Sequence, residues 1–170
     1  MMSNASARSH DLLVKWRRVL DEQGVHALLR LLNSRTPHRY TGIYRYDPPT
    51  LRNVFLVDAF DPSMLRGPDV AMEDAYCVLV GERKQSIVFT DASCDPRFAP
   101  RTNSPVVSYC GTLLSTADGV PYGTLCHYDV SRCDENVNDI EVLEALAPYV
   151  MAKIAAERPD ELPRASPFLP

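Results

Sequence analysis

Apolar residues between positions 11 and 32 recur every three or four residues along the chain. They are Leu12, Trp16, Val19, Leu20, Val25, Leu28, Leu29 and Leu32. This spacing predicts an amphipathic helix with one apolar stripe, interrupted at Gly24. The stretch 33–36 has capping and turn residues and precedes Pro37, which cannot continue a helix. The pattern therefore predicts that the chain enters a strand shortly after Pro37.

Strand-forming residues dominate the middle of the chain. Residues 41–46 and 51–57 are rich in β-branched and aromatic side chains and flank Asp47-Pro48-Pro49, which predicts a β-hairpin. A third strand is expected at 87–89. Strands at 106–114 and 123–130 flank Asp118-Gly119, a strong hairpin turn. That second hairpin places Cys110 across from His127, or from Cys126 if the turn shifts by one residue.

Two further helices and a tail complete the expected order. Gly67-Pro68-Asp69 has helix-starting chemistry, and Gly81 is expected to end that short helix. Asn138 and Glu141 fit a capping box before a final helix, which Pro148 should kink. Beyond residue 158, repeated prolines predict an unstructured segment. The sequence thus predicts an α+β domain at 10–157, between a flexible N-terminus at 1–9 and a disordered Pro-rich tail at 158–170.

Composition and charge narrow the functional classes. The 170 residues are 45% hydrophobic and carry a formal charge of −4, which disfavours nucleic acid and anionic membrane as partners. The N-terminus has no apolar segment typical of a secretion signal, and no run approaches the roughly 18 apolar residues of a membrane span. We therefore expect a cytoplasmic protein whose five cysteines are reduced.

Three phrases in the second half of the chain resemble the GAF family. They are Ile87-Val88-Phe89-Thr90-Asp91-Ala92 followed by Asp95-Pro96-Arg97-Phe98, Ser108-Tyr109-Cys110-Gly111-Thr112-Leu113, and Gly123-Thr124-Leu125-Cys126-His127-Tyr128-Asp129. The resemblance implies an antiparallel sheet of five or six strands. It also implies amphipathic N- and C-terminal helices on one face and a ligand pocket on the other.

The resemblance also suggests pocket residues, but no ligand. The candidates are Tyr76, Asp91, Asp95, Arg97, Phe98, Ser108, Tyr109 and His127. Aromatic rings would supply apolar walls, and Asp, Arg or Ser would orient a ligand. The alternative for Asp95-Pro96-Arg97 is a self-bonded turn in which Arg97 pairs with Asp95. The chain lacks the cysteine-histidine pair of bilin-binding members and the Asn-Lys-x-Phe-Asp phrase of cyclic-nucleotide binders, so the cofactor stays unknown.

The cysteines are considered as thiols rather than as zinc ligands. No pair has the C-x2-4-C spacing of a zinc knuckle, so no metal site is expected. Cys77, Cys94, Cys110 and Cys126 are possible redox thiols, although a strand cysteine often acts as a small buried hydrophobe. Free methionine sulfoxide reductases are GAF proteins that use cysteines, and Cys77 with Cys94 loosely resembles their arrangement.

Three functional hypotheses follow. The first is a small-molecule-binding or signal-sensing GAF domain that acts without catalysis, through conformational change or partner binding. The second is a thiol-dependent reductase, and the third is a degenerate dimerisation module with a filled pocket. A cavity of ~300 Å³ or more beneath segment 91–109 would favour ligand binding. A homodimer through the terminal helices is expected from the apolar residues Leu12, Trp16, Val19, Leu20, Val150, Met151 and Ile154.

Overall fold

A computed structural model describes residues 4–97, 103–134 and 139–168. Within these ranges the chain forms a six-stranded sheet in the order β3-β2-β1-β6-β5-β4, and every neighbouring pair is antiparallel. The strands are β1 Tyr40–Asp47, β2 Thr50–Asp58, β3 Val70–Ala71, β4 Ile87–Phe89, β5 Ser108–Ser115 and β6 Pro121–Asp129. The helices are α1 Asn4–Gln23, α2 Val25–Asn33, α3 Cys77–Arg83 and α4 Ile140–Glu157, with 3-10 turns η1 Met72–Asp74 and η3 Pro159–Glu161.

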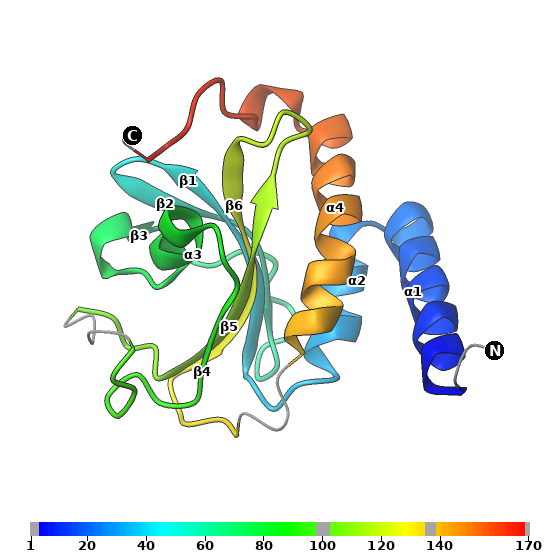
Figure 1. Ribbon diagram of the computed structural model, residues 1–170, viewed down its shortest axis with the longest axis horizontal. Coiled ribbons are helices and arrows are strands. Elements are labelled where there is room, and N and C mark those ends of the chain that lie inside the picture. Colours follow the sequence, from blue (N-terminus) through cyan, green and yellow to red (C-terminus); the bar gives the residue numbers. More distant parts are fainter. Residues whose placement is uncertain (1–3, 98–102, 135–138, 169–170) are drawn as a thin grey trace.

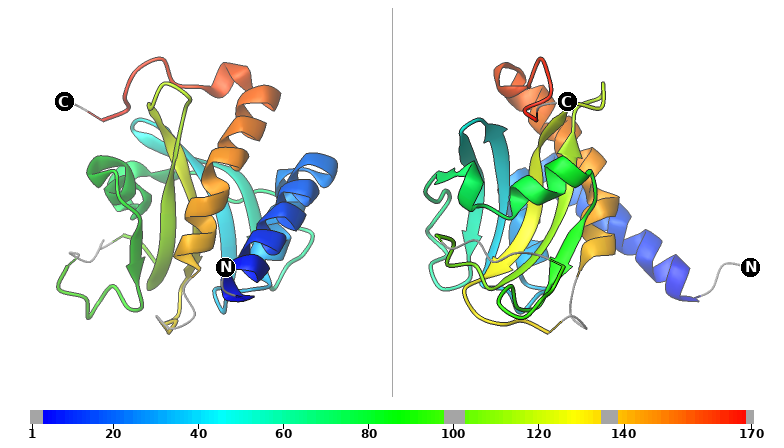
Figure 2. Two further views of the ribbon diagram at one scale, coloured as in Figure 1. Left: turned by 45° about the vertical axis from the view of Figure 1, so that its right-hand side comes forward. Right: turned by 60° about the vertical axis from the view of Figure 1, so that its left-hand side comes forward.

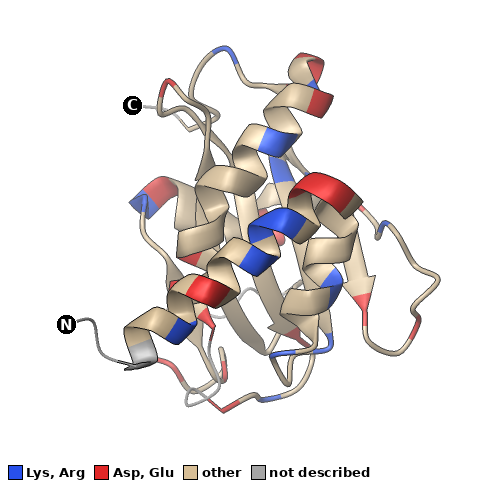
Figure 3. Ribbon diagram, turned by 90° about the vertical axis from the view of Figure 1, so that its right-hand side faces the viewer, with Lys and Arg blue, Asp and Glu red and all other residues tan. Residues whose placement is uncertain are grey.

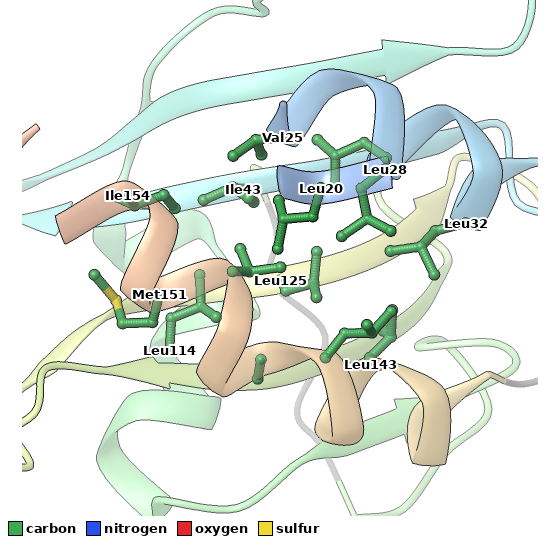
Figure 4. Close-up of a cluster of buried hydrophobic side chains, with 14 of the residues drawn as sticks. Leu20, Val25, Leu28, Leu32, Ile43, Leu114, Leu125, Leu143, Met151 and Ile154 are labelled. Carbon is green, nitrogen blue, oxygen red and sulfur yellow. The ribbon is translucent and has the colours of Figure 1, made fainter. Parts of the chain in front are cut away.

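The helices divide unequally between the two faces of the sheet. α1, α2 and α4 lie on one face, and α3 lies on the other (Figure 1; Figure 2). This is the predicted α+β architecture, with the terminal helices sharing one face. Side chains from α2 and α4, such as Leu28 and Ile154, pack against Ile43 and Leu125 of the sheet to form the main core (Figure 4). The opposite face is therefore left to α3 and the loops.

The predicted N-terminal helix is two helices that meet at Gly24. Gly24 has φ 93°, a backbone conformation that favours glycine, so its interruption of the helix is confirmed. α1 begins at Asn4, within the segment that the sequence suggests is flexible. The side chains of residues 6–12 are exposed, and the hydrophobic pattern consequently gives no sign of these first turns.

The predicted hairpin of β5 and β6 is confirmed in its register. Cys110 pairs with His127, and Gly119 in the turn has φ 82°. The first hairpin, β1 with β2, also forms around the predicted turn. Both hairpins depend on local turn chemistry, which sequence patterns report well.

The helix predicted from Gly67-Pro68-Asp69 to Gly81 is wrong at both ends. Asp69 accepts a hydrogen bond from the backbone N–H of Asn53 at 2.9 Å, which holds this stretch against β2 as the short strand β3. The α-helix begins only at Cys77, and Lys84, with φ 51°, follows its last residue. Gly81 lies inside α3, where a Cβ would collide with the ring of Phe168 and the hydroxyl of Tyr46.

The C-terminal segment differs from the expected unstructured tail. It contains η3 and returns along the edge of the domain, where the Phe168 ring contacts Tyr46 at a centroid distance of 4.8 Å. The space above Gly81 accommodates that aromatic ring. Proline content therefore indicates neither the 3-10 turn η3 nor the packing of Phe168.

Most of the apolar residues expected to form a dimer interface pack within their own domain. Trp16, Leu20, Val150 and Ile154 are buried among α1, α2, α4 and the sheet. Leu12 and Val14 of α1 remain exposed. The outer surface of the helices carries charges of both signs (Figure 3). None of the described helices combines the length and apolar character that a membrane span requires.

Candidate functional site

A cavity of about 520 Å³ opens on the face of the sheet that bears α3. Its walls come from β1, β2, β3, η1, the start of α3, the segment 103–106 and the ends of β5 and β6. The volume exceeds the expected minimum of ~300 Å³ and lies in the usual range of small-molecule sites. Part of segment 91–109 contributes to it, through residues 103–106 and Tyr109.

Tyrosine is the dominant side chain of the cavity wall. Five of the chain's eight tyrosines line it: Tyr40, Tyr44, Tyr76, Tyr109 and Tyr128. The hydroxyls of Tyr44 and Tyr128 share a hydrogen bond of 2.6 Å, and the Tyr40 and Tyr128 rings stack at 4.9 Å. Burial is the main cause that raises the pKa of Tyr44 and Tyr128, so both hydroxyls stay protonated at neutral pH. The wall thus offers aromatic surface with neutral hydrogen-bonding groups.

The ion pair between Arg39 and Asp58 brings one positive and one negative charge to the cavity wall. Arg39 donates from Nε to Asp58 Oδ1 at 2.7 Å and from its terminal nitrogen to Oδ2 at 2.8 Å. The hydrogen bond from Arg39 lowers the pKa of Asp58 despite the opposing effect of burial. A bidentate pair of this kind holds both side chains in fixed positions, so they can orient a polar group of a ligand.

The rim of the cavity is closed on one side by a contact between two loops. Asn103 donates from Nδ2 to Asp74 Oδ1 at 3.3 Å and so links segment 103–106 to η1. Both residues line the cavity, and the Asn103 side chain is exposed. A single exposed hydrogen bond is a weak restraint on the two segments that it joins.

One thiol reaches the cavity wall. Cys77 Sγ accepts hydrogen bonds from Tyr109 Oη at 3.2 Å and from Thr124 Oγ1 at 3.1 Å. Tyr109 can lie flat on the sheet because position 111 is glycine, where a Cβ would collide with the tyrosine ring. The start of α3 is fixed from the other side by Tyr46, whose hydroxyl donates to the Cys77 carbonyl at 2.6 Å.

Only some of the residues that the sequence suggests as pocket residues line the cavity. Tyr76 and Tyr109 line the cavity, whereas Asp91, Asp95, Arg97 and Ser108 do not. Arg97 pairs with Asp95 at 2.5 Å and donates to the Val88 carbonyl, which is the self-bonded turn considered as the alternative. Ser108 is buried and donates to the Ser131 carbonyl at 2.8 Å. Phe98 lies outside the described residues.

His127 and Cys110 lie on the opposite face of the sheet from the cavity. Cys110 belongs to the core under the helices, where burial raises its pKa to about 12. His127 is fully buried, with Nδ1 2.6 Å from Thr41 Oγ1 and its ring stacked on His38. Burial is the main cause that lowers the His127 pKa, so the ring is neutral at physiological pH. Neither residue lines the cavity.

Cys94 is exposed in the loop after β4 and does not reach the cavity. Its Sγ donates to Asp91 Oδ2 at 3.7 Å. Among the described residues, no group of three or more His, Cys, Asp or Glu side chains could hold a metal ion. Of the four candidate redox thiols, Cys77 faces the cavity and Cys126 is buried beside it in the same cluster of side chains.

Sequence reasoning missed several cavity residues. Tyr44 and Tyr128 lie in predicted strands, Tyr40 directly precedes one, and their aromatic type was the available signal. Strand alternation places Tyr128 on the same face as Cys126 and Thr124, which could have directed attention to this face. Arg39 and Asp58 gave no signal, because they are neighbours only through the pairing of β1 with β2.

The arrangement described above is the GAF fold: an antiparallel sheet with terminal helices on one face and a cavity on the other. Solved GAF domains of phosphoenolpyruvate-protein phosphotransferases support this. That from Acinetobacter has a TM-score of 0.63 at 17% identity, covering 91% of this chain and 97% of the other. That from Coxiella burnetii has a TM-score of 0.62 at 17% identity, covering 93% and 98%.

Enzymes share this fold. Free methionine-R-sulfoxide reductase from Neisseria meningitidis, solved in complex with its substrate, has a TM-score of 0.65 at 14% identity and covers 94% of this chain and 96% of its own. No family model matches the sequence, and no curated protein matches it either. At these identities the likeness establishes the fold, and the function has to be argued from the cavity.

Proposed function

We propose that the chain is a GAF-fold sensory domain that binds a small, largely apolar molecule in the tyrosine-lined cavity. The observation that carries the proposal is the cavity itself, at about 520 Å³, with five tyrosines in its wall. Apolar walls with a few fixed polar groups are typical of small-molecule sites. The open volume favours binding over the alternative of a degenerate module whose pocket is filled by its own side chains.

The output of binding would be a change at the rim. The contact between Asn103 and Asp74 joins two loops that a ligand must part or clamp. A ligand that binds one rim arrangement better than the other shifts the balance between them. The domain would then act on a partner without catalysis. The buried Tyr109 and the stacked rings of Tyr40 and Tyr128 would form a rigid floor of the cavity.

Binding of the neutral fluorescent probe N-phenyl-1-naphthylamine tests this proposal. Val130 lines the cavity and is 44% exposed, so Val130→Trp should obstruct the cavity with little effect on folding. Lys15, exposed on α1 and remote from the cavity, is the control position. We expect Val130→Trp to weaken probe binding by about tenfold and Lys15→Trp to leave it unchanged. Equal binding by both variants, with both folded by circular dichroism, would contradict the proposal.

A second candidate function is thiol-dependent reduction of a small molecule. It is favoured by one observation: Cys77 Sγ lies in the cavity wall with two hydroxyl donors directed at it. Formation of methionine from free methionine sulfoxide in the presence of dithiothreitol is the test. Activity that Cys77→Ser abolishes and Cys94→Ser retains would support the enzyme. Absence of turnover in the wild type would leave the sensory proposal standing alone.

A further inference from the structure

A second thiol lies next to Cys77 at the floor of the cavity. Cys126 follows Thr124 by two residues in β6, so both side chains are on the face of the sheet that carries α3. Thr124 donates to Cys77 Sγ at 3.1 Å, and the Cys126 thiol donates to the Gly42 carbonyl at 3.7 Å. Two cysteines that are 49 positions apart in the sequence therefore belong to one buried cluster of side chains.

The two thiols have different surroundings. Burial is the largest influence and raises the pKa of Cys77, but hydrogen bonds to its sulfur, among them those from Thr124 and Tyr109, turn the net direction downward. Burial, followed by the neighbouring Cys77, raises the pKa of Cys126 well above the usual value. Cys77 is therefore the more acidic thiol of the two. Only the thiolate is a strong nucleophile.

Access to the pair is also unequal. Cys77 lines the cavity, whereas Cys126 is fully buried and does not. A molecule that enters the cavity meets Cys77 first. Cys77 is only 5% exposed, so a bulky charged disulfide cannot reach its sulfur, but a small neutral oxidant can. The hydroxyls of Tyr109 and Thr124 lie where they can donate to an oxygen bound beside that sulfur.

We propose that Cys77 and Cys126 form a hydroperoxide-reactive thiol pair at the cavity floor, with Cys77 as the attacking sulfur and Cys126 as the sulfur that closes the disulfide. This reaction goes beyond the proposed function, because it needs the cavity as an entrance but needs no bound ligand. The class of substrate is a small neutral hydroperoxide, of which hydrogen peroxide is the simplest.

The chemistry balances in two steps. The Cys77 thiolate attacks one oxygen of the hydroperoxide, the O–O bond breaks, and the leaving oxygen takes the proton that Cys77 released, which yields an alcohol or water and a sulfenic acid on Cys77. The Cys126 thiol then attacks that sulfur, and its proton leaves with the hydroxyl group as water. Two thiols are oxidised to one disulfide, and one hydroperoxide is reduced.

Treatment of the reduced full chain with equimolar hydrogen peroxide tests the proposal. Mass spectrometry should show a loss of 2 Da, as expected for one disulfide, and non-reducing peptide mapping should join the peptides of Cys77 and Cys126. Differential alkylation should show Cys77 reacting at least about tenfold faster than Cys110, whose thiol is buried on the other face. These measurements use the wild-type chain alone, so they do not depend on whether a variant folds.

Variants assign the roles. Cys126→Ser should accumulate a sulfenic acid on Cys77 that dimedone traps, and Cys94→Ser, the exposed control, should form the same disulfide as the wild type. Tyr109→Phe should move the pH midpoint of the reaction up by about one unit and slow it about tenfold at pH 7, because the thiolate loses a donor. Oxidation confined to Cys94, a disulfide between other cysteines, or equal reactivity of Cys77 and Cys110 would overturn the proposal.

Discussion

Gly111 has no side chain and so leaves space for the ring of Tyr109, which forms part of the cavity wall. A Cβ on Gly111 would occupy the space of the Tyr109 ring, which is fully buried and cannot swing away freely. We expect Gly111→Ala to destabilise the fold by about 1–3 kcal/mol, the usual cost of overpacking. Urea unfolding followed by circular dichroism measures the change.

A double-mutant cycle checks the physical reason. If the cost arises from the Tyr109 ring, Gly111→Ala should cost much less in a Tyr109→Leu background than in the wild type. Strictly additive effects would show that the ring is not the cause.

The aromatic and the charged candidate residues of the pocket differ in whether they line the cavity. Tyr76 and Tyr109 were suggested as cavity residues by the family resemblance, and both line the cavity, Tyr76 just before α3 and Tyr109 in β5. Asp91 and Arg97 were suggested as ligand contacts. The structure instead places Asp91 in contact with Ser93 and Arg97 in contact with Asp95, both within their own loop. Charged loop residues satisfy each other when they are close in sequence, so their presence alone does not indicate a ligand.

His38, which is buried between α2 and β1 in the chain, makes the stability of the fold depend on pH. Burial is the main cause that lowers the pKa of His38 to about 4, with the neighbouring His127 acting in the same direction and Asp129 opposing it. The folded state therefore keeps His38 neutral below pH 6.5, while the unfolded chain takes up a proton. Since the unfolded state binds more protons between about pH 6.5 and pH 4, stability falls as the pH falls through that range.

Urea unfolding at pH 7 and pH 5 tests this statement. We expect His38 to account for roughly 2 kcal/mol of lost stability between the two pH values. His38→Gln should reduce the loss, and His10→Gln, at an exposed position on α1, should not. A wild type that is equally stable at both pH values would contradict the account.

Elements held together by local sequence were predictable, and those held by distant contacts were not. The turn at Asp118-Gly119 determines the pairing of β5 with β6, so the sequence narrowed the partner of Cys110 to His127 or Cys126, and the structure pairs it with His127. The strand β3 forms because Asp69 contacts β2, and α3 contains a glycine because Phe168 packs on it. The second partner in each case lies at least 16 positions away in the sequence, where periodicity carries no information.

At the scale of the whole molecule, the homodimer proposal now depends on the exposed side of α1. Trp16 and Ile154 belong to the core, so charged substitutions there would unfold the domain instead of separating protomers. Leu12 and Val14 are 40% and 52% exposed and are available to a second copy. Sedimentation velocity should show a wild-type dimer that Leu12→Glu with Val14→Glu converts to a monomer, while Lys15→Glu stays dimeric. A wild type that is monomeric at high micromolar concentration contradicts this proposal.

The cavity is a property of the assembled fold. Its wall combines residues from position 39 to position 130, so the sequence could suggest a pocket on this face but could not determine its volume or its five tyrosines. The family resemblance predicted the arrangement of the sheet and helices, but it did not predict which side chains line the cavity. The lining depends on which side chains strand pairing brings together, and the proposed function depends on that lining.

Native mass spectrometry of the purified full chain after exposure to a mixed extract of small metabolites tests the central claim most directly. The account predicts that one small molecule is retained per chain, that it is released on denaturation, and that Val130→Trp greatly reduces its retention while Lys15→Trp retains it fully. Bare protein mass in every sample, or a molecule that both variants retain equally, would contradict a ligand site in the cavity.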